Sequence, residues 1–364
     1  MDSLRCPSAS VSYTFKAKRH RVQPVGSGPK GGTHSHVLPL RADTATSVGI
    51  DMSSSSSAIR RPFNARPLYR GLKHLFMPKP LLHRVLSAAK RMTVRRQVDE
   101  RARLARDLPA AGPGAGDGIH LDELDACQLF QPEQLPGALA TAERCVALFE
   151  AFKASGEAET LLQRNRNKPF LLSVISGNEF ADHPDLLRFA VSRPLLDAAS
   201  RYLGTVPVVE GMALWWTPPN ASSQSSQEWH IDELAPRQVK VLMNCLEVTA
   251  EQGPLHFIPA RASEDARARL RHRSGRLGDT ALESTGATAA EQCAIGPAGA
   301  GVILDSSRCL HFGSRGNARD RLVLTFHYLP LDAPTETRYN LQLPELPPEC
   351  ADLDPMQRLA LGFR

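Results

Sequence analysis

Two histidines, one aspartate and one arginine in the second half of the chain have the types and order that metal chemistry needs. His230 and Asp232 are separated by one residue, and His311 and then Arg321 follow further along. Two imidazoles and one carboxylate are the ligand set of non-haem Fe(II) sites, which keep coordination positions open for a substrate and for O2. An arginine on a later strand could bind the far carboxylate of a dicarboxylic acid with its forked guanidinium. Together the four residues indicate an oxygenase.

The tripeptide His-x-Asp occurs three times, so its context must decide which copy could bind a metal. The copy at His183 coincides with a predicted helix start, where residues two apart point about 200° away from each other. The copy at His120 follows a loop and has no downstream partner that the third copy does not fit better. The third copy lies between strand-like segments, and alternate residues of a strand share one face. We therefore expect His230 and Asp232 to meet at one ion, with a surface pair at a strand end as the alternative.

Arg321 begins an apolar run, 321–330, that is typical of a buried strand. A buried guanidinium without a partner is costly, so this position predicts an anion nearby. The anion is either a ligand carboxylate or, in an ordinary salt bridge, Asp305 or Asp320. Arg319 is the nearest competitor for the ligand, but it lies in the preceding loop.

Three blocks of sequence around these residues resemble the phytanoyl-CoA dioxygenase family. They are 229–232, 251–259, and 309–313 followed by Arg321, and the resemblance extends over roughly 110–345. That family comprises Fe(II)- and 2-oxoglutarate-dependent oxygenases. The resemblance implies a mainly β fold, a double-stranded β-helix of the jelly-roll or cupin type braced by flanking α-helices.

The resemblance also implies a role for each candidate residue. His230, Asp232 and His311 would ligate Fe(II), and Arg321 would bind the distal carboxylate of the cosubstrate 2-oxoglutarate, with O2 as the oxidant. Halogenation is disfavoured, because related halogenases replace the ligating carboxylate with a small residue. One departure concerns the serine that the family carries two places after the distal histidine. Here that place is Gly313, which weakens the expectation of a hydroxyl beside Arg321.

Strand-like runs supply candidates for the wall of the cofactor pocket. Leu242 and Asn244 share one strand face and are assigned to cofactor binding, with core packing as the alternative. The same two interpretations apply to a second face: Met212, Leu214 and Trp216. Two further histidines in such runs are expected to be ordinary core or surface residues: His256 and His327.

The charge of the chain is concentrated near its start. Residues 1–57 carry seven basic and three acidic side chains, and residues 58–107 carry fourteen and three. The remaining 23 basic and 32 acidic residues give a net charge of −9, which argues against nucleic acid as the partner of that part. We expect four regions: a disordered or over-long N-terminal extension (1–57), a basic helical arm (58–108), an oxygenase domain (109–346) with a candidate lid insertion (261–292), and a tail (347–364).

Helical spacing predicts how the arm and the body helices are built. In the arm the apolar positions are Leu81, Leu82, Val85, Leu86, Ala89 and Met92, with basic residues between them. Such a helix could cover the protein's own apolar face, lie weakly on an anionic membrane surface, or bind nucleic acid. In the body we expect helices over 133–153 and, divided at Pro194, up to Leu203 before Gly204.

Two function classes remain open. The first is an Fe(II)- and 2-oxoglutarate-dependent hydroxylase of a small molecule, such as a lipid, an acyl-thioester or another metabolite. The second is a non-catalytic metal- or ligand-binding barrel whose arm serves a partner or a membrane surface. Seven cysteines without a C-x-x-C pair predict neither a disulfide framework nor a zinc site, and they favour the reducing cytoplasm. The sequence names neither the prime substrate nor the oligomeric state.

Overall fold

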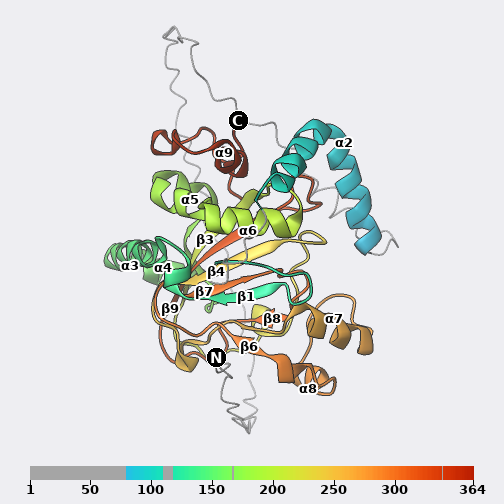
Figure 1. The fold of residues 1–364 in the computed structure, drawn as a ribbon. Helices are drawn as coiled ribbons and strands as arrows, with labels where there is room; N and C mark the ends of the chain where they lie inside the picture. The colour runs from blue at the N-terminus through green and yellow to red at the C-terminus, as the bar shows by residue number, and fades with distance from the viewer. Residues whose placement is uncertain (1–78, 110–117, 166–167, 338) are drawn as a thin grey trace, which may run out of the picture. The chain divides into compact units, whose positions relative to one another are not determined.

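Two antiparallel sheets carry the strands of the protein (Figure 1). The computed structural model describes residues 79–109, 118–165, 168–337 and 339–364, so the expected extension 1–57 lies outside the described residues. The larger sheet has the order β1-β7-β4-β9-β3-β2: β1 (Cys127–Phe130), β7 (Gly301–Leu304), β4 (Val239–Asn244), β9 (Arg321–Leu329), β3 (Val208–Thr217) and β2 (Leu172–Ser176). The smaller has the order β6-β5-β8: β6 (Gln292–Cys293), β5 (His256–Phe257) and β8 (His311–Phe312). The expected mainly β class with flanking helices is confirmed, although the described strands form two sheets rather than one closed barrel.

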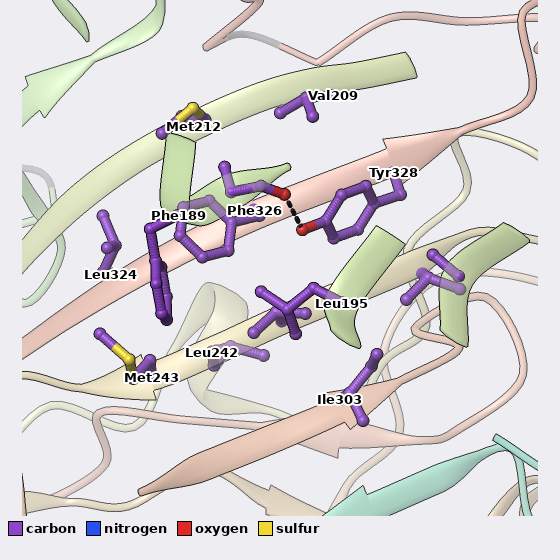
Figure 2. Close-up of a cluster of buried hydrophobic side chains, with 14 of the residues drawn as sticks. Phe189, Leu195, Val209, Met212, Leu242, Met243, Ile303, Leu324, Phe326 and Tyr328 are labelled. Carbon is purple, nitrogen blue, oxygen red and sulfur yellow. Dashed lines mark hydrogen bonds between the residues drawn. The ribbon is translucent and has the colours of Figure 1, made fainter. Parts of the chain in front are cut away.

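The larger sheet has two different faces. One packs against helices, and the other lines a cavity. On β9 the residues Leu322, Leu324, Phe326 and Tyr328 all face the helix side, where they are almost fully buried. Phe189 of α5 packs its ring 5.9 Å from Phe326, and the Tyr328 hydroxyl donates to the carbonyl of Ala190 (Figure 2). The alternate residues of β9 are left to form the opposite face, because side chains of a strand alternate.

The helices of the body are α3 (Ala138–Ala154), α4 (Glu157–Arg164), α5 (Pro184–Ala190), α6 (Arg193–Leu203) and α9 (Pro355–Leu361). Three of them correspond to predicted segments (α3, α5 and α6), and two were not predicted (α4 and α9). The pair of α5 and α6 is divided at Val191–Ser192, just before the predicted Pro194, which lies in the first turn of α6. The end at Gly204 is confirmed, and Gly204 adopts the left-handed φ of 67° that ends many helices. The predicted start of the 133–153 helix is wrong. Gly137, at φ 84°, separates a short 3-10 turn from α3, which begins at Ala138.

The described part of the arm forms helix α2 (Lys79–Arg106), and the face that it buries differs in part from the predicted one. Its buried positions recur every three or four residues: Leu82, Leu86, Lys90, Val94, Val98, Arg101 and Ala105. The predicted apolar positions Leu81, Val85 and Met92 are instead exposed. Leu82 and Leu86 are buried as predicted. The rest of the stripe was missed because two of its members, Lys90 and Arg101, are basic, and they are buried by bonding to backbone carbonyls rather than to water. Lys90 donates to Ala333 O at 2.8 Å.

The insertion 261–292 is folded, with helices α7 (Ala260–Arg269) and α8 (Asp279–Glu283). Its apolar residues pack with those that flank the candidate ligands in one cluster: Trp229, Ile258, Ala266, Leu277, Leu282, Leu310 and Phe312. In Figure 1 the two helices lie beside the smaller sheet. The segment therefore supports the site, and its role as a lid stays a prediction.

Candidate metal centre

The two candidate histidines are joined by a short antiparallel contact between distant parts of the chain. The amide of His230 donates to the carbonyl of His311 at 3.0 Å, and the amide of His311 donates back at 2.9 Å. Two residues on, the amide of Asp232 donates to the carbonyl of Ser306 at 2.7 Å. These bonds hold the two segments in register, and the extended backbone places His230 and Asp232 on the same side.

The three side chains converge as a metal-binding triad would. One ligand atom from each of His230, Asp232 and His311 lies within 4.8 Å of the others. The Nδ1 atoms lie 2.8 Å from the Glu228 carbonyl oxygen and 2.9 Å from that of Cys309, respectively. Because a carbonyl only accepts, each neutral ring donates from Nδ1 and turns the lone pair of Nε2 toward the carboxylate. Backbone bonding thus selects the tautomer that a metal requires.

Burial and neighbouring charge set the protonation states of the triad. Burial, with the neighbouring His230, lowers the pKa of His311 to about 3. Burial also lowers the pKa of His230, against the opposing effect of Asp232. Burial alone would raise the pKa of Asp232, but Lys240 and the histidines hold it well below its usual value. Neutral imidazoles and an ionised carboxylate are the forms that ligate a metal.

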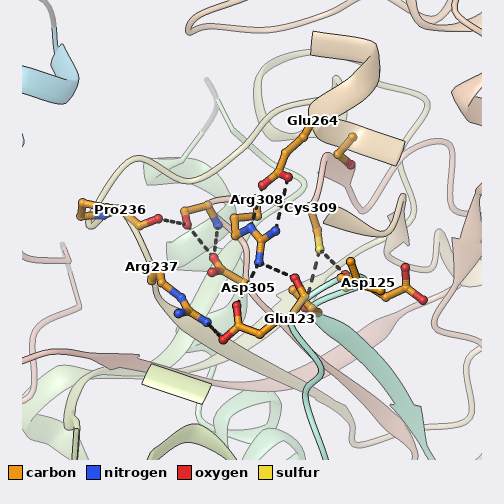
Figure 3. Close-up of polar contacts among 12 residues, drawn as sticks. Glu123, Asp125, Pro236, Arg237, Glu264, Asp305, Arg308 and Cys309 are labelled. Carbon is orange, nitrogen blue, oxygen red and sulfur yellow. Dashed lines mark hydrogen bonds and ion pairs between the residues drawn. The ribbon is translucent and has the colours of Figure 1, made fainter. Parts of the chain in front are cut away.

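A polar network fastens the loop 305–310 that leads into His311 (Figure 3). Asp305 accepts a hydrogen bond from the Tyr202 hydroxyl at 2.8 Å. Arg308 donates to Glu264 of α7 at 2.7 Å and to the same tyrosine hydroxyl at 3.1 Å. The loop supplies the carbonyls that accept from the Asp232 amide and from the His311 ring. The network therefore positions two of the three ligands.

Arg321 lies at the start of β9, opposite Thr217 of β3, and is 5% exposed. Its Nη1 donates to Ser314 Oγ at 3.2 Å, whereas Nε and Nη2 have no hydrogen-bond partner among the described residues. Burial lowers its pKa to about 10, so the guanidinium stays charged at neutral pH. Two buried N–H groups on one edge of a guanidinium are suited to a bidentate carboxylate.

The ordinary salt-bridge interpretations of Arg321 are wrong. Asp305 belongs to the loop network, and Asp320 accepts from a tryptophan indole at 2.7 Å. Arg319 has a side chain that is 70% exposed, and it pairs with Glu251 at 3.0 Å. Within the described parts of the chain, no carboxylate lies in ion-pair range of Arg321, so its charge is available to a ligand.

Gly313 stands where the resembling family carries a serine, but a serine hydroxyl still lies beside Arg321. Ser314, one residue later, has a left-handed φ of 64°. In this conformation its Oγ lies 3.1 Å from Thr217 Oγ1 as well as within reach of Arg321. The serine thus lies one residue later in the chain than the family pattern predicts, and its hydroxyl contacts the guanidinium of Arg321.

A cavity of about 550 Å³ contains the triad and Arg321. Its walls come from alternate residues of three neighbouring strands: Gly211, Ala213, Trp215 and Thr217 of β3, Lys240 and Leu242 of β4, and Arg321, Val323, Thr325 and His327 of β9. Leu242 thus lines the cavity, and its role in cofactor binding stays a prediction. Asn244 is not among the lining residues, and its amide group donates to Ala294 O at 3.2 Å. Of the alternative set, Leu214 and Trp216 belong to the hydrophobic core, and Met212 reaches both the core and the cavity.

Sequence reasoning missed the polar wall that Lys240 and His327 form. The two residues are directly paired between β4 and β9, and both line the cavity. Lys240 Nζ donates to Asp232 Oδ2 at 3.1 Å, and burial lowers the pKa of His327 to about 3. His327 was expected to be an ordinary core or surface residue. The alternation of Val239, Lys240 and Val241 was the available signal that one face of β4 is polar.

The remaining histidine candidates lie elsewhere. His120 is exposed, and His183 precedes the first turn of α5. His256 pairs with Glu291 at 2.6 Å and stacks on Phe312, as expected for an ordinary histidine. Over all described residues, the triad is the one group of three or more His, Cys, Asp or Glu side chains close enough to hold an ion.

The donor set fits ferrous iron on the evidence of the side chains themselves. His311 is 3% exposed, and its Nε2 has no hydrogen-bond partner in the described chain. A buried polar atom in that state calls for a ligand. Two imidazole nitrogens and one carboxylate oxygen match the facial triad of non-haem Fe(II) sites, with the cavity on the open side.

Comparisons with known proteins give remote structural likenesses. No family model matches the chain, and no curated protein matches its sequence. Among solved structures, it is similar to EctD from S. alaskensis with 2-oxoglutarate and 5-hydroxyectoine, at 16% identity and a TM-score of 0.44 over 62% of this chain and 82% of that one. It is also similar to the nogalamycin epimerase SnoN with Fe3+ and alpha ketoglutarate, at 13% identity and a TM-score of 0.38 over 64% and 83%. At such identities and scores, the functional argument rests on this chain's own side chains.

Proposed function

We propose that this protein is a non-haem Fe(II)- and 2-oxoglutarate-dependent oxygenase that hydroxylates a small molecule. One observation carries the proposal: a single cavity contains the triad of His230, Asp232 and His311 together with the unpaired buried guanidinium of Arg321. A metal and a dicarboxylate satisfy both sets of groups at once. We also propose that the chain is related to the phytanoyl-CoA dioxygenases, on the three sequence blocks that contain these residues.

The proposed reaction inserts one oxygen atom of O2 into a substrate C–H bond and the other into succinate, with release of CO2 from 2-oxoglutarate. Bound Fe(II) would supply the activation of O2 that this chemistry requires. Arg321 would fix the distal carboxylate of the cosubstrate, with its guanidinium oriented by Ser314. The triad residues would hold the metal at the other end of the cosubstrate.

The remaining cavity residues would orient the substrate and exclude water. Trp215 and Tyr339 form an edge-to-face pair with centroids 4.5 Å apart on the wall, next to apolar lining residues. Lys240 would hold the free oxygen of Asp232 and so fix which oxygen faces the metal. A cavity of about 550 Å³ suits a metabolite beside the cosubstrate. These features support a small-molecule substrate.

The proposal is tested by succinate formation from 2-oxoglutarate with ferrous iron and ascorbate, since uncoupled turnover needs no prime substrate. His311→Ala should abolish succinate formation, because the site loses a ligand. His120→Ala is the matched control, since it removes an exposed histidine of another His-x-Asp copy and should leave turnover unchanged. Anaerobic Fe(II) titration followed by calorimetry should show one site in the native chain and none in His311→Ala.

The same experiment separates the catalytic from the non-catalytic interpretation. If the chain binds Fe(II) and 2-oxoglutarate but forms no succinate, the non-catalytic metal- and ligand-binding interpretation is correct. A chain that binds neither would refute both proposals.

A further inference from the structure

Helix α2 presents a surface that the proposed catalysis does not use. Leu81, Val85 and Met92 are 48%, 47% and 77% exposed, and they are three of the five large exposed hydrophobic side chains of the described chain. At 100° per residue, these three and Ala88 fall within about 60° of one another around the helix. The outer side of α2 therefore carries a continuous apolar stripe.

Arginines border this stripe. Arg84 and Arg91 are exposed, and their helical angles place them along one edge of it. Arg95 is also exposed, and it follows a kink in the helix at Val94. The sequence has no acidic residue from 79 to 98. Asp99 is the first acidic residue, and its carboxylate oxygens lie 3.7 Å from Arg91 Nη2 and 3.7 Å from Arg95 Nε. The outer side is thus basic as well as apolar, although the body of the chain is acidic.

The inner side of α2 is fixed, so the helix cannot roll over to cover the stripe. Arg101 is fully buried and donates to the carbonyls of Val206, Pro207 and Leu359. Lys90 donates to Ala333 O and lies 3.8 Å from Glu336, a residue of the cavity wall. These inner contacts keep the stripe on the exposed side of the helix.

We propose that α2 docks the protein on an anionic phospholipid surface through Leu81, Val85 and Met92. The apolar side chains would enter the boundary between headgroups and acyl chains, while the arginine stems extend toward the phosphates. Nucleic acid would pair with the arginines but leave the apolar stripe in water, so lipid accounts for both features. The proposal goes beyond the oxygenase assignment and does not depend on it.

Sedimentation with vesicles tests the proposal on the full chain. The protein should pellet with vesicles of phosphatidylcholine and phosphatidylglycerol, but not with phosphatidylcholine alone, and added salt should weaken the binding. Val85→Glu with Met92→Glu should reduce partitioning by about a hundredfold, since each substitution removes an apolar anchor and adds repulsion.

The matched control is Leu139→Glu, which places a carboxylate on a 52% exposed leucine of α3. One such substitution should weaken partitioning no more than about twofold, because it changes the net charge without touching the stripe. Equal pelleting with neutral vesicles, no pelleting at all, or native partitioning of the stripe variant would each overturn the proposal. A native dimer that the stripe variant converts to a monomer would also overturn it, by assigning the stripe to a second copy. Succinate formation without vesicles should be the same in the stripe variant and the native chain.

Discussion

Each candidate ligand is oriented by a bond made close to it in the chain. His230 and His311 are both held through Nδ1 by a carbonyl two residues earlier, and Lys240 holds one oxygen of Asp232. The ligand atoms that remain point toward one another. Arg321 is the exception, since two of its three guanidinium nitrogens have no hydrogen-bond partner among the described residues. The site is thus preorganised at the metal end and open at the carboxylate end.

Arg321→Ala should raise the 2-oxoglutarate concentration for half-maximal succinate formation by about a hundredfold, the effect of a buried charge pair worth about 3 kcal/mol. Arg321→Lys should raise it less, because the charge stays but the two-pronged geometry is lost. Arg319→Ala is the control, since its exposed side chain pairs with Glu251 outside the cavity. An unchanged requirement in Arg321→Ala would refute the assignment of the cosubstrate site.

Ser314→Ala should have a smaller effect of the same kind. The hydroxyl contacts both Arg321 and Thr217, so its loss frees the guanidinium to tilt. We expect about a fivefold higher requirement for 2-oxoglutarate, as for one hydrogen bond of about 1 kcal/mol, with little change in kcat. Initial rates of succinate formation measure both parameters. A fall in kcat alone would mean that Ser314 acts on the reacting centre instead.

Loops and strands decide where these side chains meet. The register of β4 and β9 pairs Lys240 with His327 inside the cavity, and the loop 305–310 brings His311 to His230. That loop is fastened by Asp305, which accepts from Tyr202 of α6, and by Arg308, which donates to Glu264 of α7. A substitution in this network should therefore change the affinity for Fe(II), even though the substituted residue is not a metal ligand.

The variant Tyr202→Phe tests whether the polar network affects Fe(II) binding. It removes the hydroxyl that donates to Asp305 and accepts from Arg308, so Fe(II) binding should weaken by about fivefold. Tyr328→Phe is the matched control, because its hydroxyl bonds to Ala190 on the helix side of the sheet. Both variants should lose about 1 kcal/mol of unfolding free energy, but only the first should lose Fe(II) affinity in calorimetry. Equal Fe(II) affinities would show that the network is structural alone.

The complete fold depends on contacts between parts that are far apart in the chain. Arg101 of α2 joins the turn before β3 to the end of α9 through three carbonyls. Lys90 of the same helix reaches the cavity wall at Glu336. Helix α2 is thus an integral part of the body rather than an appendage.

No helix in the described residues is long and apolar enough to cross a membrane.

Arg101→Met should lower the free energy of unfolding by about 3 kcal/mol, because it leaves buried carbonyls without donors. Arg103→Met is the control, since Arg103 is exposed and pairs only with Asp107 four residues later. Urea denaturation of both variants measures the difference. A loss in Arg101→Met no larger than in the control would mean that α2 is weakly attached.

The residues alone were enough to predict the chemical core of the site. Residue type and order predicted that His230, Asp232 and His311 converge, as they do in the structure, because a facial triad demands particular functional groups. Their role as metal ligands, and that of Arg321 as a carboxylate anchor, stay proposals. A continuous apolar run predicted β9, and Gly204 predicted the end of α6. These inferences hold because they depend on local chemistry and local backbone preference.

Tertiary structure decided everything that depends on register and on partners distant in sequence. Only the pairing of β4 with β9 places Lys240 and His327 in the cavity and leaves Asn244 outside it. Only the packing of α2 buries Lys90 and Arg101 and exposes Met92, the reverse of what hydrophobicity predicts. A shift of one residue in a strand turns each side chain to the other face, and a buried cation is stable only if carbonyls from other segments reach it. Neither condition can be read from a residue and its neighbours in the chain.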